Sequence, residues 1–223
     1  MFVAFPSSFE SRGLQIGCLK ADLGRCHDAY YGWMRSISHV RASSTIYTEI
    51  DSALAALTPL GPLSTKTLLL ETKGNWTVVV DDHMPYPDPI PTVSALAQKL
   101  GCQGVVACNA PDLKDPSGNQ ISYGATQLQI FSPRTTDFLN YKRTISVAHA
   151  EEGWRFDLAG EVQPYEDLAR YKKRRIRERF DESMLISYLE AMGIECGHKA
   201  WFSGNGIVIP IGTREQMPWS FTK

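Results

Sequence analysis

The sequence is short of the features that mark secreted, membrane and metal-binding proteins. Its five cysteines are odd in number and form no C-x-x-C pair, which argues against a disulfide framework and a zinc ribbon. No apolar run approaches the roughly 20 residues that a membrane-spanning helix needs. The opening residues carry no basic stretch, and Pro6 breaks their apolar run, unlike a secretory signal. We therefore expect reduced thiols, no membrane partner and a cytoplasmic location.

Signatures of catalysis are also missing. The chain holds no G-x-S-x-G, Walker A or G-x-G-x-x-G motif. Two cysteines lie close in sequence to histidines, at Cys26-His27 and Cys196-Gly-His198, but a Cys/His nucleophile pair is assembled in space. We assign no catalytic residue and no cofactor. Whether the protein is an enzyme stays open, with a binding role favoured.

The composition is that of a globular domain. The chain has 223 residues, of which 43% are hydrophobic and 21% are charged, with a formal net charge of -1. It is long enough to bury a substantial core, and it shows no internal repeat and no linker. We predict one domain over residues 1–223. Residues 1–42 show no sustained period of 2 or 3.6, so we expect a loop-rich segment packed on that domain.

Hydrophobic periodicity places two helices and a hairpin in the first half of the chain. Helical spacing covers residues 46–57, after a serine N-cap. Two apolar runs on either side of Lys73-Gly74 predict a hairpin. Residues 92–100 predict a second helix, and Gly101 is suited to end it.

The second half begins with a run of strands. Residues 105–108 form a short apolar run, and residues 125–131, 144–149 and 154–158 alternate apolar with polar side chains. Glu151-Glu152-Gly153 fits the turn between the last two strands. The fold class is therefore α+β, with a mainly antiparallel sheet and helices before and after the strand meander.

The sharpest departure from average composition is a basic stretch. Seven of the ten residues at 170–179 are Lys or Arg. Apolar spacing at 164–180 predicts a basic helix, and Asp181 is suited to cap a second helix that ends at Gly193. This C-terminal helical pair is expected to close over the sheet, with residues 207–209 as a last strand.

The basic stretch has three interpretations. It forms a solvated helix face, it docks an acidic protein partner, or it contacts nucleic acid. Nucleic acid is less favoured, because the chain is not basic overall and shows no nucleic-acid-binding motif. The residues predicted to contact a partner are Arg170, Lys173, Arg174, Arg175, Arg177 and Arg179.

A second charged segment follows the hairpin. Asp81, Asp82 and Asp88 lie in a loop with four prolines, and we include them among the predicted partner-binding residues. As an alternative, Asp81, Asp82 and His83 supply oxygen and nitrogen donors that suit a divalent metal. That alternative predicts a metal-assisted hydrolase, although the loop has no recognised ligand spacing.

Four blocks of the chain carry a family resemblance. GNWTVVVDD, ALAQKLGCQGVVACNAPD, YGATQLQIFSP and NYKRTISVAHAEEGWRFDLAGEVQPYEDLARYKKRRIRERFDESML resemble a family of uncharacterised bacterial proteins, over about residues 54–194. Small proteins of this kind look like immunity proteins of polymorphic or contact-delivered toxins. The resemblance implies a protein that neutralises a cognate toxin by direct binding, with no catalytic residue to carry over. Many immunity proteins are strongly acidic, and this chain departs from that pattern.

Overall fold

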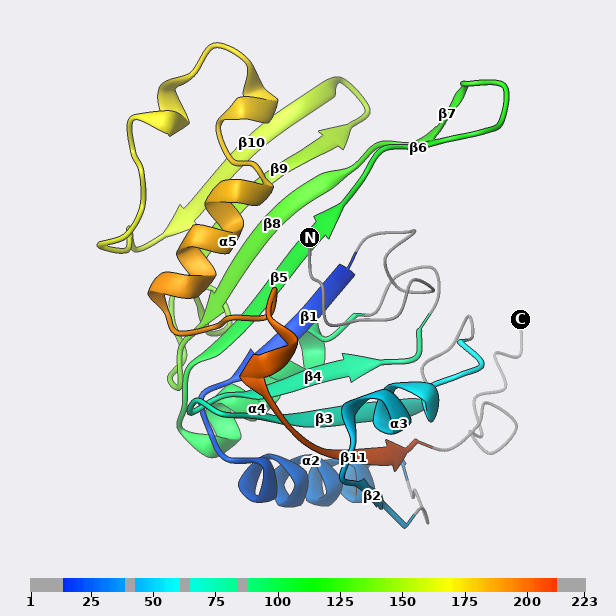
Figure 1. The fold of residues 1–223 in the computed structure, drawn as a ribbon. Coiled ribbons are helices and arrows are strands. Elements are labelled where there is room, and N and C mark those ends of the chain that lie inside the picture. The colour runs from blue at the N-terminus through cyan, green and yellow to red at the C-terminus, as the bar shows by residue number, and fades with distance from the viewer. Residues whose placement is uncertain (1–13, 39–42, 61–64, 84–87, 212–223) are drawn as a thin grey trace, which may run out of the picture.

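The chain folds around one large antiparallel sheet, which Figure 1 shows running through the whole molecule. The computed structural model describes residues 14–38, 43–60, 65–83 and 88–211. The α+β class predicted from periodicity is confirmed. Among the described helices, none is both long and apolar enough to cross a membrane.

The sheet has nine strands, and every neighbouring pair is antiparallel. From one edge to the other they are β10 (Gly153–Gly160), β9 (Tyr141–Ala150), β8 (Ala125–Phe131), β5 (Gly104–Ala110), β1 (Leu14–Leu19), β4 (Thr77–Asp81), β3 (Lys66–Thr72), β11 (Phe202–Pro210) and β2 (Thr45–Tyr47). The predicted meander is β8-β9-β10, and the predicted hairpin is β3-β4. A small ribbon of β6 (Leu113–Lys114) and β7 (Gln120–Ser122) extends beyond β5 and β8.

Two helices cover one face of the sheet, α2 (Leu23–Ser38) and α4 (Ile90–Leu100). Val93 and Leu96 of α4 pack on this face beside Val79 of β4. Gly17 of β1 allows the close approach, because a Cβ there would lie 2.4 Å from Cγ2 of Val93. The helix α4 ends at Gly101 with φ +63, as predicted.

The opposite face is covered by α3 (Ile50–Ala55), α5 (Glu182–Ala191) and the chain between β10 and α5. Asp181 caps α5 by accepting a hydrogen bond from the N–H of Met184, as predicted. The remaining short turns are the 3-10 elements η1 (Arg170–Lys172), η2 (Ile176–Glu178) and η3 (Lys199–Trp201).

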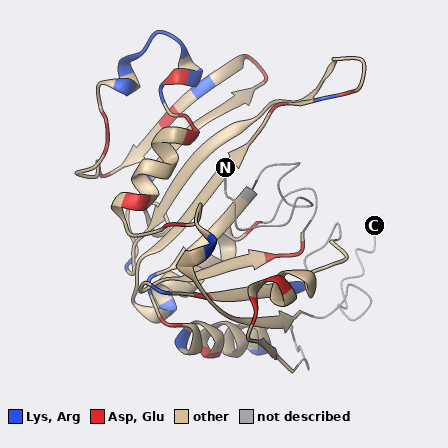
Figure 2. Ribbon diagram, in the orientation of Figure 1, with Lys and Arg blue, Asp and Glu red and all other residues tan. Residues whose placement is uncertain are grey.

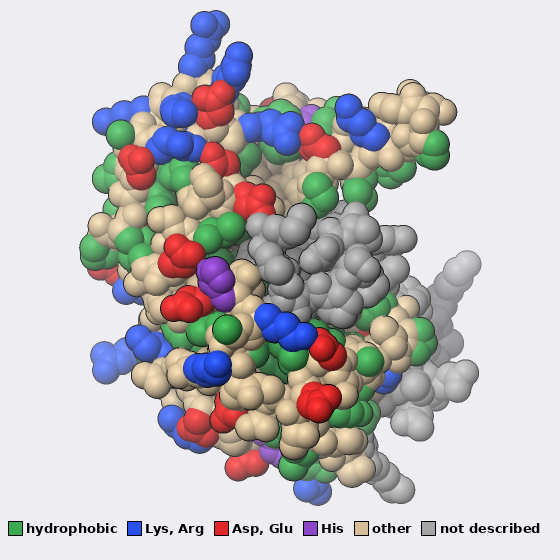
Figure 3. Space-filling model, in the orientation of Figure 1, with side chains coloured by type: hydrophobic (Ala, Val, Ile, Leu, Met, Phe, Trp, Pro, Cys, Tyr) green, Lys and Arg blue, Asp and Glu red, His purple; other side chains and the backbone are tan. Residues whose placement is uncertain are grey.

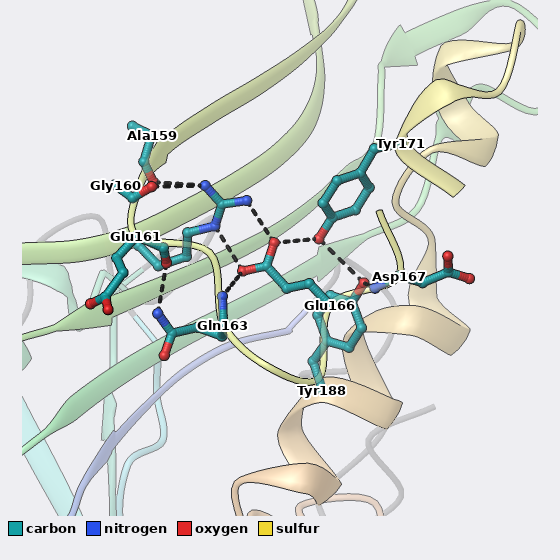
Figure 4. A network of polar contacts seen from close by, with 9 residues as sticks. Ala159, Gly160, Glu161, Gln163, Glu166, Asp167, Tyr171 and Tyr188 are labelled. Carbon is teal, nitrogen blue, oxygen red and sulfur yellow. Dashed lines mark hydrogen bonds and ion pairs between the residues drawn. The ribbon is translucent and has the colours of Figure 1, made fainter. Parts of the chain in front are cut away.

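A buried ion pair anchors the chain that follows β10 (Figure 4). The Arg143 guanidinium of β9 donates to both carboxylate oxygens of Glu166, at 2.9 and 2.6 Å, and the two side chains are 3% and 0% exposed. Glu166 also accepts from the N–H of Gln163 and the hydroxyl of Tyr171. The Tyr188 hydroxyl of α5 accepts from the N–H of Asp167. The network joins sheet, connecting segment and helix.

The predicted basic helix over residues 164–180 is wrong, and with it the C-terminal helical pair. The segment contains no α-helix but turns and the 3-10 elements η1 and η2, which are separated by extended backbone at Lys173 (ψ 146) and Arg175 (ψ 119). Like charges three and four residues apart repel along a helix. In this path Glu166 pairs with Arg143 and Arg170 pairs with Asp181. A continuous helix would hold Arg170 and Asp181 roughly 16 Å apart along its axis.

Two further expectations differ from the structure. Where residues 1–42 are described, they are not loop-rich, because they form the strand β1 and the 16-residue helix α2. Both faces of β1 are covered, so it shows no alternation. The helix expected at 46–57 is split, because Ile46 pairs with Ile207 in β2 and only α3 is helical.

Candidate functional site

The basic segment, residues 170–179, lies at the β10 end of the molecule. Figure 2 shows the chain there as a loop rich in Lys and Arg, and Figure 3 shows these side chains gathered at that end of the surface. Much of this charge is paired within the chain. Arg170 forms an ion pair with Asp181, and Glu178 pairs with Lys173 at 3.5 Å and Arg175 at 3.2 Å.

Arg177 contacts both an aromatic ring and a carboxylate outside the basic segment. Its guanidinium lies over the ring of Trp154, 4.3 Å from the ring centroid, and donates to the Asp112 carboxylate at 3.0 Å. The N–H of Gly124 and, after it, the charge of Arg177 hold the pKa of Asp112 below its ordinary value. Arg177 therefore joins the basic segment to β10 and to the loop after β5.

An aromatic stack continues this surface. Tyr123 lies parallel to His149, with ring centroids 3.6 Å apart, and Trp154 meets both rings edge-on. His149 and Trp154 are opposite residues of the β9-β10 ladder, so the sheet fixes their spacing. Tyr123 remains 49% exposed. We call Asp112, Tyr123, His149, Trp154 and Arg177 the arginine–aromatic surface.

A hollow of about 270 Å³ lies beside this surface. Trp154 and Arg177 form part of its lining, and Asp181 and Glu182 bring the start of α5 to it. Asn109 and Thr126 line it from the sheet, where the Thr126 hydroxyl donates to the Asn109 side chain at 3.1 Å. The hollow combines apolar, basic and acidic groups within a small volume.

The remaining basic residues are divided between inward and outward positions. Arg179 donates to the carbonyl of Lys173 at 2.7 Å, and its guanidinium lies 5.8 Å from the Phe156 ring centroid. Arg174 is exposed and makes no ion pair among the described residues. The predicted partner-binding cations therefore lie together, but most of them also stabilise the segment itself.

The acidic loop has a structural role in its described part. Asp82 is buried and accepts from the N–H groups of Thr65 and Lys66 and from the Thr65 hydroxyl. Asp81 accepts from the N–H groups of His83 and Asp88. Burial raises the pKa of the Asp81 carboxyl to about 6, against the opposing effect of those two N–H groups.

These contacts bear on the metal alternative. Asp81 and Asp82 direct their carboxylates to different segments, and among described residues no group of three His, Cys, Asp or Glu side chains is placed to hold a metal ion. Asp88 is exposed at the end of the loop. Four strands separate β4 from β10, so the acidic loop and the basic segment lie some 20 Å apart or more.

The cysteines are placed as reduced thiols rather than as nucleophiles. All five are free, and Cys18, Cys26 and Cys196 are buried. Burial raises the pKa of Cys26 and Cys196 to about 12 and that of Cys108 to about 11. His27 hydrogen-bonds to Ser44 and Asp28 instead of a thiol.

A larger hollow of about 690 Å³ lies at the opposite end of β8-β10. Phe138 and Tyr141 form its aromatic wall, with ring centroids 5.7 Å apart. Lys142 and Glu161 lie at this hollow and pair with each other at 3.8 Å. No predicted site residue contributes to its lining.

Sequence reasoning identified the cations of this site but missed the aromatic groups that hold them. The turn at 151–153 would have placed His149 opposite Trp154, since hairpin register follows from the turn. Nothing in the sequence indicated that Tyr123 and Asp112 come together there. Comparison with known proteins gives no further guide, since no family model, curated protein or solved structure matches the chain.

Proposed function

We propose that this protein is a protein-binding module, and that it binds its partner through the arginine–aromatic surface. The observation that carries the proposal is Arg177, held between Trp154 and Asp112 beside the half-exposed Tyr123. Arg, Trp and Tyr are the residue types that dominate the energy of protein interfaces. Their fixed positions lower the entropy lost when a partner binds.

The charges of this surface favour a partner with acidic groups around an apolar contact. Arg174 and Arg177 lie within three residues of each other, and Arg174 has no internal ion pair among the described residues. Acidic side chains of the partner would pair with Arg174 and the neighbouring cations of the basic segment. An apolar side chain of the partner would cover Tyr123. Charge of this kind raises the association rate more than the affinity.

The family resemblance makes the proposal more specific. A bacterial immunity protein neutralises its cognate toxin by direct binding, which requires a rigid recognition surface and no catalytic group. The arginine–aromatic surface supports this role, because β9, β10 and η2 and the loops beside β5 and β8 each contribute a residue to it. We therefore propose a toxin as the partner.

The first experiment identifies the partner by position. A photo-crosslinking residue replaces Tyr123 in the full chain, and the matched control places it at Phe138, an exposed aromatic at the opposite end of β8-β10. In lysate of the source organism, the proposal expects one protein adduct at position 123 that is absent at position 138. Equal adducts at both positions, or an adduct with nucleic acid only, would overturn it.

The second experiment tests the toxin role with the partner so identified. Expression of the partner alone should stop growth, and co-expression of this chain should restore it. Arg177→Ala should abolish the rescue, whereas Arg134→Ala, which removes an exposed arginine of the β8–β9 loop, should not. A partner that is harmless alone would refute the immunity role and leave the binding role standing.

A further inference from the structure

The two edges of the sheet differ in length. One edge is β2, which has three residues, and the other is β10, which has eight. A long open edge presents unpaired main-chain groups that pair readily with another strand. Proteins therefore keep such edges short, or guard them with proline or charges. We therefore ask whether the edge strand β10 is protected in one of these ways.

The hydrogen-bond pattern shows which main-chain groups of β10 face outward. The N–H of Glu161 donates to the carbonyl of Lys142 at 2.9 Å, so odd-numbered residues of β10 bond to β9. The N–H and C=O groups of Trp154, Phe156 and Leu158 therefore point away from β9. Within the described part of the chain, they make no hydrogen bond.

The side chains of β10 alternate between the two faces. Trp154, Phe156 and Leu158 lie on the α5 face, where Leu158 is still 44% exposed. Arg155 and Asp157 lie on the opposite face and are exposed. Arg155 pairs with the exposed Glu152, and Asp157 has no ion-pair partner among the described residues.

The charges at 155 and 157 do not prevent β10 from pairing with a second copy of itself. Two like charges at 155 and 157 would repel any antiparallel copy of the strand. One Arg and one Asp instead attract a copy, provided that each lies opposite the other. The sequence Trp-Arg-Phe-Asp-Leu at 154–158 is apolar, basic, apolar, acidic and apolar, so it is complementary to itself when reversed.

We propose that β10 pairs with β10 of a second copy of this chain, as an antiparallel dimer with Phe156 on the two-fold axis. In this register Arg155 lies opposite Asp157 of the other copy, twice, and Trp154 lies opposite Leu158, twice. Trp154, Phe156 and Leu158 form the hydrogen-bonded pairs, which uses their outward main-chain groups. The two nine-stranded sheets become one continuous sheet.

Neighbouring registers are disfavoured by charge. A shift of two residues in one direction places Arg155 opposite Arg155, and the opposite shift places Asp157 opposite Asp157. The proposed register also places the basic segments of both copies on the same face of the joined sheet, flanking the axis. The dimer goes beyond the proposed binding function and does not depend on it.

A mixed-cysteine experiment tests the register. Arg155→Cys and Asp157→Cys are made in separate copies of the chain, both at exposed positions. Opposite residues of a non-hydrogen-bonded pair have Cα atoms about 4.5 Å apart, within reach of a disulfide. Like positions of the two copies are about 8 Å apart, which is too far. We expect linked dimers in the mixture only.

The wild-type chain is the control for its own thiols. Dimers linked in either single variant alone as readily as in the mixture would overturn the register. Absence of linked dimers in the mixture, at a concentration where the chain sediments as a dimer, would do the same. A chain that sediments as a monomer at all concentrations up to about 100 µM would overturn the dimer.

Sedimentation velocity tests the charges and the edge. Arg155→Asp should weaken the dimer about 30-fold, the factor that about 2 kcal/mol gives, and adding Asp157→Arg should restore it. Leu158→Pro removes an outward N–H without touching the β9 ladder, so it should abolish the dimer in a folded chain. Circular dichroism of each variant confirms the fold. A dimer that survives Leu158→Pro in a folded chain would overturn the proposal.

Discussion

Removal of the Glu166 side chain should detach the segment between β10 and α5 from the sheet and destabilise the fold. The Glu166 side chain is fully buried and accepts from Arg143, Gln163 and Tyr171 (Figure 4). Breaking a buried pair by deleting one partner leaves an uncompensated charge and costs about 3–5 kcal/mol. We expect Glu166→Ala to lower the free energy of unfolding by that amount, measured by urea denaturation. This is a large part of the stability of an ordinary domain.

A double variant separates the ion pair from the packing around it. Arg143→Met with Glu166→Leu should lose about 2 kcal/mol less than the sum of the single losses, because neither charge is left unpaired. The neighbouring pair of Lys142 and Glu161 is the control. It is exposed and 3.8 Å long, so Glu161→Ala should cost less than about 1 kcal/mol. Additive losses for Arg143 and Glu166 would refute the reasoning.

Three further predictions concern burial and backbone shape. The pKa of Asp81 is raised to about 6, so the folded state favours the protonated carboxyl. The stability that this carboxyl contributes is complete below its unfolded pKa, near 4, and is lost as the pH rises through 6. Urea denaturation should therefore show wild type losing up to about 3 kcal/mol between pH 4 and 7 relative to Asp81→Asn, and parallel pH curves would contradict this. Gly160→Ala should lower the melting temperature more than Gly101→Ala. Both glycines have positive φ, but only at 160 would a Cβ lie 2.2 Å from a carbonyl, that of Lys142; equal shifts would contradict this. Thiol labelling at pH 8 should be slow in the folded chain and complete in urea, because burial raises the pKa of Cys26 and of the other cysteines. A cysteine that is labelled rapidly in the folded chain would contradict this prediction.

Periodicity and capping residues were sufficient to predict an element where only one of its faces is covered by the rest of the protein. The strand at 125–131 alternates over most of its length because Leu128 and Ile130 face α5, whereas Gln127 and Gln129 lie on the other face. The helix at 90–100 has a single apolar stripe and a glycine stop, and Asp181 starts α5 as its side-chain chemistry predicts. The α+β class followed from these elements.

Local signals failed where distant residues decide the structure. The strand β1 is covered on both faces, so its sequence shows no period. The basic segment has helical spacing, but its Arg170 pairs with Asp181 and its Tyr171 bonds to the buried Glu166 carboxylate, contacts that go with the extended path. Of the candidate site, the sequence indicated the cations. It did not indicate the aromatic groups, because Tyr123 and Trp154 meet only after the sheet has formed.

The sheet can be completed only late in synthesis, because strand β11 comes near the end of the chain. It lies between β3 and β2, so until residue 210 has left the ribosome, β3 has an open edge and β2 has no neighbour. The exposed edge would carry the apolar run Leu68 to Leu70, which is prone to pair with other nascent chains. We expect polypeptides that stop before residue 202 to aggregate and to depend on chaperones, whereas chains that include β11 fold to a closed sheet.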